Sequence, residues 1–395
     1  MDTSDYEAIL PHYDIYNPEH VQIRDGVLAY AREHCPVPHT DSEGGFHLIT
    51  RYDDVRRVLL DPATFSSTGV GPRPSPICLN PLDADPPYQV ELRKLLNPLF
   101  SRAALMRFEP VMRGIARDLV DGWVDRETID LAADFSIPFA ATTLARIVFD
   151  GFDDHTMVEI VDVVDRVGSG DVGAYAELLA YAAKFLAMYE DGSANTDNRL
   201  IAALLEGTVG GGRPLTTEER LGVISVTFLG GLDTVRGVIP MIALELDADP
   251  ALEQRLRDPN WVRNDLDELI RLLSPVTLMG RTVMRDCEVG DTKLKAGDRV
   301  LVFFGSASRD PERFENPDVL EFDTPRPAHA SFGLGVHRCL GMHLARLQLE
   351  IAFDELLKQI TNIKVVGPVT WATGIAQIPE SLPIRFDRVR VGASR

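Results

Sequence analysis

Apolar side chains recur at helical spacing through most of the middle of the chain. Residues 88–100, 108–124 and 174–192 carry them at positions i, i+3 and i+4, which is the pattern of helices with one buried face. Residues 342–360 repeat this pattern near the end of the chain. The spacing predicts a protein whose core is built mainly from helices.

The longest apolar stretch covers residues 221–246 and contains only three charged side chains. Thr216 and Glu219 precede it with the spacing of a capping box, in which each residue satisfies a backbone N–H of the other at a helix start. We expect one long helix here. The charges within it favour a helix buried in a protein core over a membrane span.

Strand patterns are short and lie towards the two ends of the chain. Residues 281–304 alternate apolar and polar side chains around two Gly-Asp turns, which predicts hairpin strands. Residues 46–67 resemble a short strand followed by a helix that ends at Asp61-Pro62. Residues 374–387 predict extended turns. Because no repeat or flexible linker interrupts the chain, we expect residues 1–395 to form a single, mainly α domain with a small β region.

Charge and cysteine content narrow the class of protein. The chain has 395 residues with 40 Lys and Arg against 60 Asp and Glu, a net charge of −20. Such a surface repels nucleic acid and anionic lipid as a whole. The N-terminus lacks the basic and apolar regions of a signal peptide, and none of the four cysteines lies in a C-x-x-C pair. We expect a cytoplasmic monomer in a reducing compartment, with no membrane or nucleic acid partner.

One cysteine has unusual surroundings, in the stretch FGLGVHRCLG at residues 332–341. Cys339 directly precedes a predicted helix, whose first N–H groups carry partial positive charge, and Arg338 and His337 lie beside it. These features favour a thiolate, which suits a metal ligand or a nucleophile. A lone cysteine is most often a buried structural residue, so the full pattern of the loop has to decide.

The pattern F-x-x-G-x-H-x-C-x-G in this stretch resembles the haem-binding loop of the cytochrome P450 monooxygenases. The resemblance implies the cytochrome P450 fold, with a long central distal helix and short β-sheets, and haem b (iron protoporphyrin IX) as cofactor. It also implies that the metal ligand is Cys339, as the axial thiolate of the iron. The residues that it assigns to cofactor binding are Cys339, His337, Arg93, Arg281, Gln89, Phe332, Gly333, Gly341 and Gly231.

Two other segments support the resemblance. Glu268 and Arg271 match the E-x-x-R helix of that family, and an i, i+3 spacing lets them pair on one helix face. Either Arg313 or Arg326 is expected to complete this network. Residues 85–96 resemble the start of the family's helix C, although the family often has His where this chain has Gln89. Arg93 and Arg281 match arginines that bind the haem propionates there, with His337 as a third partner.

The sequence GGLDTV within the long helix carries the expected catalytic residues. Two mid-helix glycines are costly, and we expect Gly230-Gly231 to break the helix. On its own this sequence equally suits a kink with a satisfied polar pair. By resemblance, Asp233 and Thr234 are the acid–alcohol pair that serves oxygen activation, with Asp233 relaying protons, and Gly231 leaves space for O2. The expected reaction is hydroxylation of an unactivated C–H bond.

The wording of this segment is most similar to the camphor-hydroxylating bacterial branch. Residues 65–87, however, contain no Tyr, and that branch uses a Tyr there to hold the substrate carbonyl. Camphor is therefore expected to be a poor substrate. Matching the branch residue by residue gives a substrate pocket of Val226, Leu229, Gly230, Val276, Thr277, Ile375 and Ala376.

These side chains are nearly all apolar and small or mid-sized, which favours a compact hydrocarbon. We expect a monoterpenoid or a norisoprenoid of ionone size. The alternatives are a larger substrate, of the fatty-acid or macrolide type, and a haem-thiolate binding or sensor protein. The chain carries no flavin or iron–sulfur motif, so a [2Fe–2S] ferredoxin with its reductase is expected to supply electrons for the reaction with O2.

Overall fold

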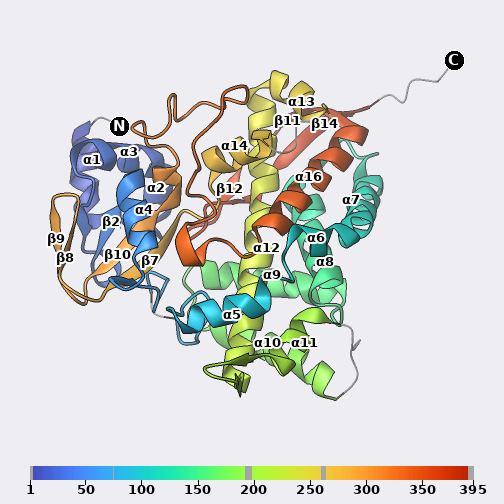
Figure 1. Ribbon diagram of the computed structural model, residues 1–395. Helices are drawn as coiled ribbons and strands as arrows, with labels where there is room; N and C mark the ends of the chain where they lie inside the picture. The colour runs from blue at the N-terminus through green and yellow to red at the C-terminus, as the bar shows by residue number, and fades with distance from the viewer. Residues whose placement is uncertain (1–2, 74, 192–197, 259–263, 390–395) are drawn as a thin grey trace.

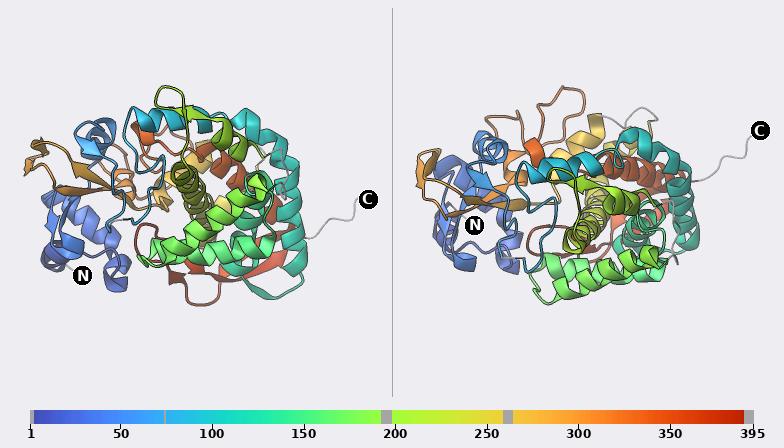
Figure 2. Two further views of the ribbon diagram at one scale, coloured as in Figure 1. Left: turned by 90° about the horizontal axis from the view of Figure 1, so that it is seen from below. Right: turned by 60° about the horizontal axis from the view of Figure 1, so that its bottom comes forward.

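The structure is a computed structural model, and it describes residues 3–73, 75–191, 198–258 and 264–389. A long helix, α12 (Thr217–Ala248), runs through the middle of the helical part, and the main sheet lies to one side with the N-terminal helices (Figure 1). In a view nearly along its axis, α12 is surrounded by other helices (Figure 2). The predicted mainly α architecture with a small β region is confirmed.

The α-helices account for about half of the described chain, and most predicted helices are present within a few residues. Their bounds are α1 Thr3–Ile9, α2 Pro18–Gln22, α3 Arg24–His34, α4 Tyr52–Leu60, α5 Tyr88–Leu96, α6 Arg102–Leu105, α7 Glu109–Trp123, α8 Ile137–Ile147, α9 Asp154–Gly168, α10 Ala174–Glu190, α11 Arg199–Glu206, α12 Thr217–Ala248, α13 Pro250–Leu256, α14 Asn264–Leu273, α15 Phe304–Ala307 and α16 Met342–Gln359. Short 3-10 or π-helical turns cover Leu10–His12, Ser42–Gly44, Met106–Phe108, Ala132–Ser136 and Gly335–His337.

The strands are short and form one larger sheet and several small ones. Their bounds are β1 His39–Thr40, β2 Phe46–Ile49, β3 Phe65–Ser66, β4 Thr128–Asp130, β5 Thr208–Val209, β6 Arg213–Pro214, β7 Leu278–Val283, β8 Cys287–Val289, β9 Thr292–Leu294, β10 Arg299–Phe303, β11 Ile360–Val365, β12 Thr370–Trp371, β13 Pro379–Ser381 and β14 Pro383–Arg388.

The main sheet has the order β1-β2-β10-β7-β3 and joins segments that are far apart in sequence. Strands β2 and β10 are parallel, whereas the other neighbours in this sheet are antiparallel. The predicted Gly-Asp hairpin is confirmed, since Gly290 has a φ of 53° and joins β8 to β9 by a two-residue turn. Arg281, a predicted site residue, lies in β7 and pairs with Val300 of β10.

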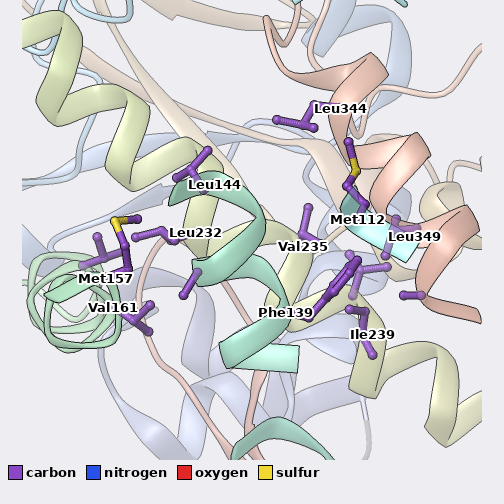
Figure 3. Packing of buried hydrophobic residues seen from close by; sticks show 14 of the residues in the cluster. Met112, Phe139, Leu144, Met157, Val161, Leu232, Val235, Ile239, Leu344 and Leu349 are labelled. Carbon is purple, nitrogen blue, oxygen red and sulfur yellow. The ribbon is translucent and has the colours of Figure 1, made fainter. Parts of the chain in front are cut away.

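Helix α12 begins with the predicted capping box. The Thr216 hydroxyl accepts from the Glu219 N–H at 3.2 Å, and the Glu219 carboxylate accepts from the Thr216 N–H at 2.8 Å. The expected break at Gly230-Gly231 is wrong, because α12 continues as one helix to Ala248. Packing on several sides holds it: side chains of α7, α8, α9 and α16 gather around Leu232, Val235 and Ile239 in Figure 3.

By length and composition, α12 is the one described helix that is apolar enough to cross a membrane. In the structure 61% of that apolar window is buried against the rest of the protein. The same side chains therefore already have protein neighbours, as the sequence predicted for a core helix.

The Glu268–Arg271 pair anchors the chain that leads into the cysteine loop. Both side chains are almost fully buried, and the two guanidinium–carboxylate hydrogen bonds measure 2.8 Å. Arg271 also donates to the carbonyls of Ser308, Pro317 and Val319. Arg326 completes the network at 3.2 Å from Glu268, whereas Arg313 lies over the ring of Tyr52. These bonds fix the backbone of residues 308–326 before the site.

Candidate active site around Cys339

The cysteine loop is a tight turn held by its own backbone. Gly333 and Gly335 adopt φ values of 66° and 68°, which favour glycine, and the Cys339 N–H donates to the Phe332 carbonyl at 2.7 Å. A Cβ at Gly335 would lie 2.8 Å from the Leu59 carbonyl oxygen, so α4 packs directly on the loop. The turn that the glycines predicted places Cys339 three residues before α16.

The environment of Cys339 differs from the expectation in its net effect. Burial raises the pKa of the thiol, and this outweighs the opposing effects of the Gly341 N–H and of the nearby Arg93, Arg346 and Arg338. The start of α16 and the Arg338 charge thus act in the predicted direction, towards the thiolate, and burial opposes them. The residue nevertheless has substantial accessible surface. A metal ion bound to this accessible sulfur would displace its proton.

Two cations lie near the loop, the buried Arg281 and the partly buried Arg93. Arg281 is 4% exposed, and its printed hydrogen bond is to the carbonyl of the adjacent Gly280 at 2.6 Å. Burial lowers the pKa of Arg281 to about 10 and also lowers the pKa of Arg93. Within the part of the chain that the structure describes, neither guanidinium forms an ion pair. Guanidinium groups of this kind are suited to binding carboxylates.

His337 lies beside these cations. Its Nε2 is 2.9 Å from the Ser67 hydroxyl. Burial, together with Arg281 and Arg93, lowers the pKa of His337 to about 4, so the imidazole is neutral at pH 7. The expected grouping of Arg93, Arg281 and His337 is thus present in the structure.

Gln89 does not face an open site. It is 1% exposed, and its Nε2 donates to the Val336 carbonyl of the cysteine loop at 2.8 Å. Its Oε1 is buried without a hydrogen-bond partner. The expected contact with the cofactor is corrected accordingly: in this structure Gln89 ties α5 to the cysteine loop.

Of the two adjacent glycines of α12, one differs from its expected role. A Cβ at Gly231 would lie 2.9 Å from both Leu144 methyl groups, so that face of α12 packs tightly on α8. A Cβ at Gly230 would meet nothing within 4 Å. Gly230, not Gly231, therefore borders open space. The Thr234 hydroxyl is on the same face, one turn on, and donates to the Gly230 carbonyl at 3.2 Å.

Asp233 is held in a charged cluster that the motif did not reveal. Its Oδ1 accepts from Arg236 Nη2 at 2.7 Å, and Arg236 also contacts Asp165 of α9. Burial raises the pKa of Asp233 to about 7, with a smaller contribution from the charge of Glu380. The spacing of Asp233 and Arg236, i and i+3, is the signal that could have suggested this pair.

The expected substrate pocket is only partly assembled. Four of its expected residues are partly buried: Val226, Leu229, Val276 and Ile375. Val276 forms an isolated antiparallel β-bridge with the buried Ala376. Thr277 does not offer a free hydroxyl, because its Oγ1 donates to the Ile375 carbonyl at 2.8 Å.

Thr277 instead lines a cavity of about 240 Å³ between α3, α14 and α15, among Arg24, Arg32 and Arg309. That cavity contains none of the other predicted site residues. Thr277, which the sequence placed in the substrate pocket, therefore lines a different cavity in this structure.

The remaining site residues fit a flat, carboxylate-bearing metal cofactor. A Cβ at Gly341, at the start of α16, would meet nothing within 4 Å, as at Gly230 on α12. Helices α12 and α16 pack against each other (Figure 1). Haem needs one thiolate and partners for two propionates. The accessible sulfur, the open positions on both helices and two guanidinium groups, one buried and one partly buried, that form no ion pair among the described residues together match it.

Two residues near the site, Asp85 and Ser67, were not identified from the sequence. The charge of Asp85 acts on Arg281, opposing the effect of burial on its pKa, and the Asp85 carboxylate accepts from the Ser67 N–H at 2.8 Å. Ser67 in turn contacts His337. The sequence gives no local signal for this link, since 270 residues separate Ser67 from His337.

Comparisons with known proteins agree with this geometry. A family model described as Cytochrome P450 matches residues 261–361. Cytochrome P450 109 of Bacillus spizizenii is 30% identical over 350 residues, covering 84% of this chain and 85% of the relative. The beta-dihydromenaquinone-9 omega-hydroxylase of Mycobacterium tuberculosis is 28% identical, covering 83% of this chain and 68% of the relative. A solved structure of a mutant of P450 EryK in complex with erythromycin B is 26% identical, with a TM-score of 0.84 and coverages of 94% and 98%.

Proposed function

Because the chain belongs to the cytochrome P450 family and is therefore a haem-dependent monooxygenase, we propose that Cys339 is the thiolate ligand of its haem iron. The observation that supports this most strongly is the tight loop that presents one accessible sulfur among three arginines, next to α16. We further propose that Arg93, Arg281 and the neutral His337 bind the propionates. When bound, the thiolate-ligated haem supplies the activation of O2.

We assign hydrogen bonding and proton transfer to the acid–alcohol pair. Thr234 carries a hydroxyl next to the open space at Gly230, where it can donate a hydrogen bond to the oxygen substrate. Asp233, with a pKa near 7, can both take up a proton from solvent and give it up at neutral pH, which is the property of an effective proton relay. The reaction is hydroxylation of a C–H bond.

We propose a small apolar substrate, a monoterpenoid or norisoprenoid of ionone size. The support is chemical: Val226, Leu229, Val276 and Ile375 offer apolar surface, and the Thr277 hydroxyl is already bound to backbone. Orientation then rests on shape, and a polar molecule would lose water without replacement. The names of the relatives, one a menaquinone hydroxylase and one bound to erythromycin B, keep a larger substrate as the second candidate.

The electron donor that we propose is a [2Fe–2S] ferredoxin with its own reductase. The chain is acidic overall, so docking an acidic ferredoxin requires a local basic face. Arg338, Arg102 and Lys94 are exposed on segments next to the cysteine loop. Burial, with the charges of Arg346, Arg102 and Arg338, lowers the pKa of His343 in α16. We also propose that residues 1–395 form one domain and act as a cytoplasmic monomer.

The spectrum of the reduced, CO-bound protein tests the ligand assignment. We expect the strongly red-shifted Soret band of a thiolate-ligated haem, and loss of that band in Cys339→His with haem still bound. Cys287→Ser, which removes another partly buried thiol, should leave the band unchanged. A histidine-type spectrum in the native protein would contradict the assignment.

Substrate class is tested separately by optical titration of the oxidised protein. We expect β-ionone and related terpenoids to move the iron from low to high spin at lower concentration than long-chain fatty acids or a macrolide. If the fatty acid or macrolide shifts the spectrum at lower concentration, the pocket is built for the larger class.

A further inference from the structure

One guanidinium joins two carboxylates that come from different helices. Arg236 of α12 is 2% exposed, and its Nη2 contacts both Asp233, on the same helix, and Asp165, on α9. Its Nε is buried without a hydrogen-bond partner. A single buried nitrogen therefore binds both acids, and a closer contact with one acid weakens its contact with the other.

The charges in this cluster do not balance. Asp233 on α12, Asp165 on α9 and Glu380 near β13 are the acids, and Arg236 is the cation among them. Glu380 is exposed and Asp165 is 31% exposed, whereas the Asp233 side chain is 18% exposed beside the buried Arg236, so water solvates the Asp233 charge least. This burial favours retention of a proton on Asp233. The pKa shifts of both residues favour their uncharged forms: burial raises the pKa of Asp233 to about 7 and lowers the pKa of Arg236 to about 10.

The helix that carries Asp165 packs against the middle of α12. Figure 3 shows Met157 and Val161 of α9 next to Leu232 of α12. Asp165 follows Val161 by one turn, and Asp233 follows Leu232 directly, so the ion pair extends this packed face. Helix α9 ends three residues later, at Gly168, where the chain turns towards α10.

We propose that Arg236 is a positioning residue that sets the proton affinity of Asp233 by dividing its charge between Asp233 and Asp165. The proton affinity of the relay carboxyl then depends on where α9 holds Asp165. A displacement of α9 away from α12 leaves Arg236 to Asp233 alone, which favours the carboxylate; a closer Asp165 favours the protonated acid. The inference rests on the proposed role of Asp233 and concerns how that role is regulated.

The test is the protonation of Asp233 in two variants that should act in opposite directions. The full-length, haem-loaded protein is titrated without substrate, and the carboxyl C=O stretch is followed by infrared difference spectroscopy, with Asp233→Asn identifying the band. Arg236→Gln removes the cation and should raise the midpoint by about one pH unit or more, whereas Asp165→Asn should lower it by about one pH unit. Shifts in the same direction, or no shift, would overturn the proposal.

The double variant separates charge sharing from simple repulsion. If Asp165 acts through Arg236, its replacement should have a smaller effect in Arg236→Gln than in the wild type. Additive shifts mean that Asp165 acts only as a distant charge, and they also overturn the proposal. Arg236→Lys, which keeps the cation, should hold the midpoint within about half a pH unit of the wild type; a full shift there counts against it.

A matched control uses another pair that involves α9. Arg146 and Asp154 form an exposed ion pair at 3.1 Å, and Arg146→Gln should leave the Asp233 midpoint unchanged. The titration needs no turnover, so its outcome is independent of the proposed reaction. If the protein oxygenates substrates but the two variants do not shift the midpoint in opposite directions, the charge sharing is refuted and the proposed reaction stands. If the shifts are opposed but the protein oxygenates no substrate, only the proposed reaction is refuted.

Discussion

The Thr234 hydroxyl combines two properties that matter at the scale of single residues. It lies beside Gly230, where α12 borders open space, and its hydrogen-bond partner in the structure is a backbone carbonyl of its own helix. The hydroxyl can turn away from that carbonyl at little energetic cost, since the Gly230 carbonyl is also the i−4 acceptor of the helix. It is therefore free to serve a ligand without disturbing α12.

We predict that Thr234→Ala consumes reductant at close to the wild-type rate but releases hydrogen peroxide. Loss of one hydrogen bond, worth about 1.5 kcal/mol, corresponds to about a tenfold fall in product formed per reductant consumed. Thr227→Ala is the matched control, because its hydroxyl binds the Val223 carbonyl two turns earlier in α12. Peroxide release equal in both variants, measured beside reductant consumption, would argue against the assignment.

At the scale of elements, the start of α12 is a local charge cluster. The Glu219 carboxylate accepts from Arg213 at 2.6 and 2.8 Å, from the Thr216 N–H and from the Tyr88 hydroxyl. These bonds, that of Arg213 foremost, lower the pKa of Glu219 to about 2. The ionised acid therefore stabilises the folded protein above the unfolded-state pKa of about 4.3, and this stabilisation is lost as the pH falls towards 2.

We predict that Glu219→Gln destabilises the protein by about 1 kcal/mol at pH 7, because Gln keeps the capping box but loses the charge beside Arg213. The difference in Tm between variant and wild type should shrink as the pH is lowered from about 4.5 to 2.5. Glu206→Gln changes an exposed acid at the end of α11 and should follow the wild type throughout. A Tm difference that persists at pH 2.5 would contradict the charge argument.

Another element-scale prediction concerns the buried network before the cysteine loop. Arg271→Met should cost about 3–5 kcal/mol in the free energy of unfolding, because Glu268 would remain buried without its main counter-charge. Adding Glu268→Gln should recover part of that loss. Urea denaturation followed by far-UV circular dichroism measures both variants, and an equal loss in the double variant would show that the three backbone bonds of Arg271 matter more than the charge pair.

At the scale of the whole molecule, the net charge is −20, so an acidic partner is repelled except where a local basic face offers positive charge. The exposed Arg338 lies within the cysteine loop, so its charge is close to the proposed haem. Arg346, in α16, is bound to Asp267 at 2.7 Å and lies over the Phe332 ring. It is therefore less available to a partner than Arg338.

We predict that Arg338→Glu weakens association with a [2Fe–2S] ferredoxin and flattens its dependence on ionic strength, while substrate-induced spin shifts stay the same. Arg285→Glu, the same change at a residue with 67% side-chain exposure near β8, is the control. Reduction rates over a range of salt concentrations measure the effect. Equal slopes for the two variants would place the docking face elsewhere.

Much of the fold and the centre of the site could be predicted from the sequence because their signals are local. Periodicity gave the helices, the capping box located the start of α12, and the glycines around Cys339 predicted the turn whose positive φ angles the structure contains. The i, i+3 spacing likewise identified the Glu268–Arg271 pair. Each of these features depends on residues within one or two turns of each other.

Tertiary structure alone decided which of two neighbours faces which surface, and which distant groups meet. Adjacent residues on a helix point about 100° apart, so only the packing of Leu144 assigns Gly231 to the core and Gly230 to open space. Arg326, not Arg313, reaches Glu268 because of how the intervening backbone is held. Arg236 contacts Asp165 only because the fold packs α9 against α12. Burial, which sets the pKa values of Cys339 and Asp233, likewise arises from the assembled chain and has no counterpart in the local sequence.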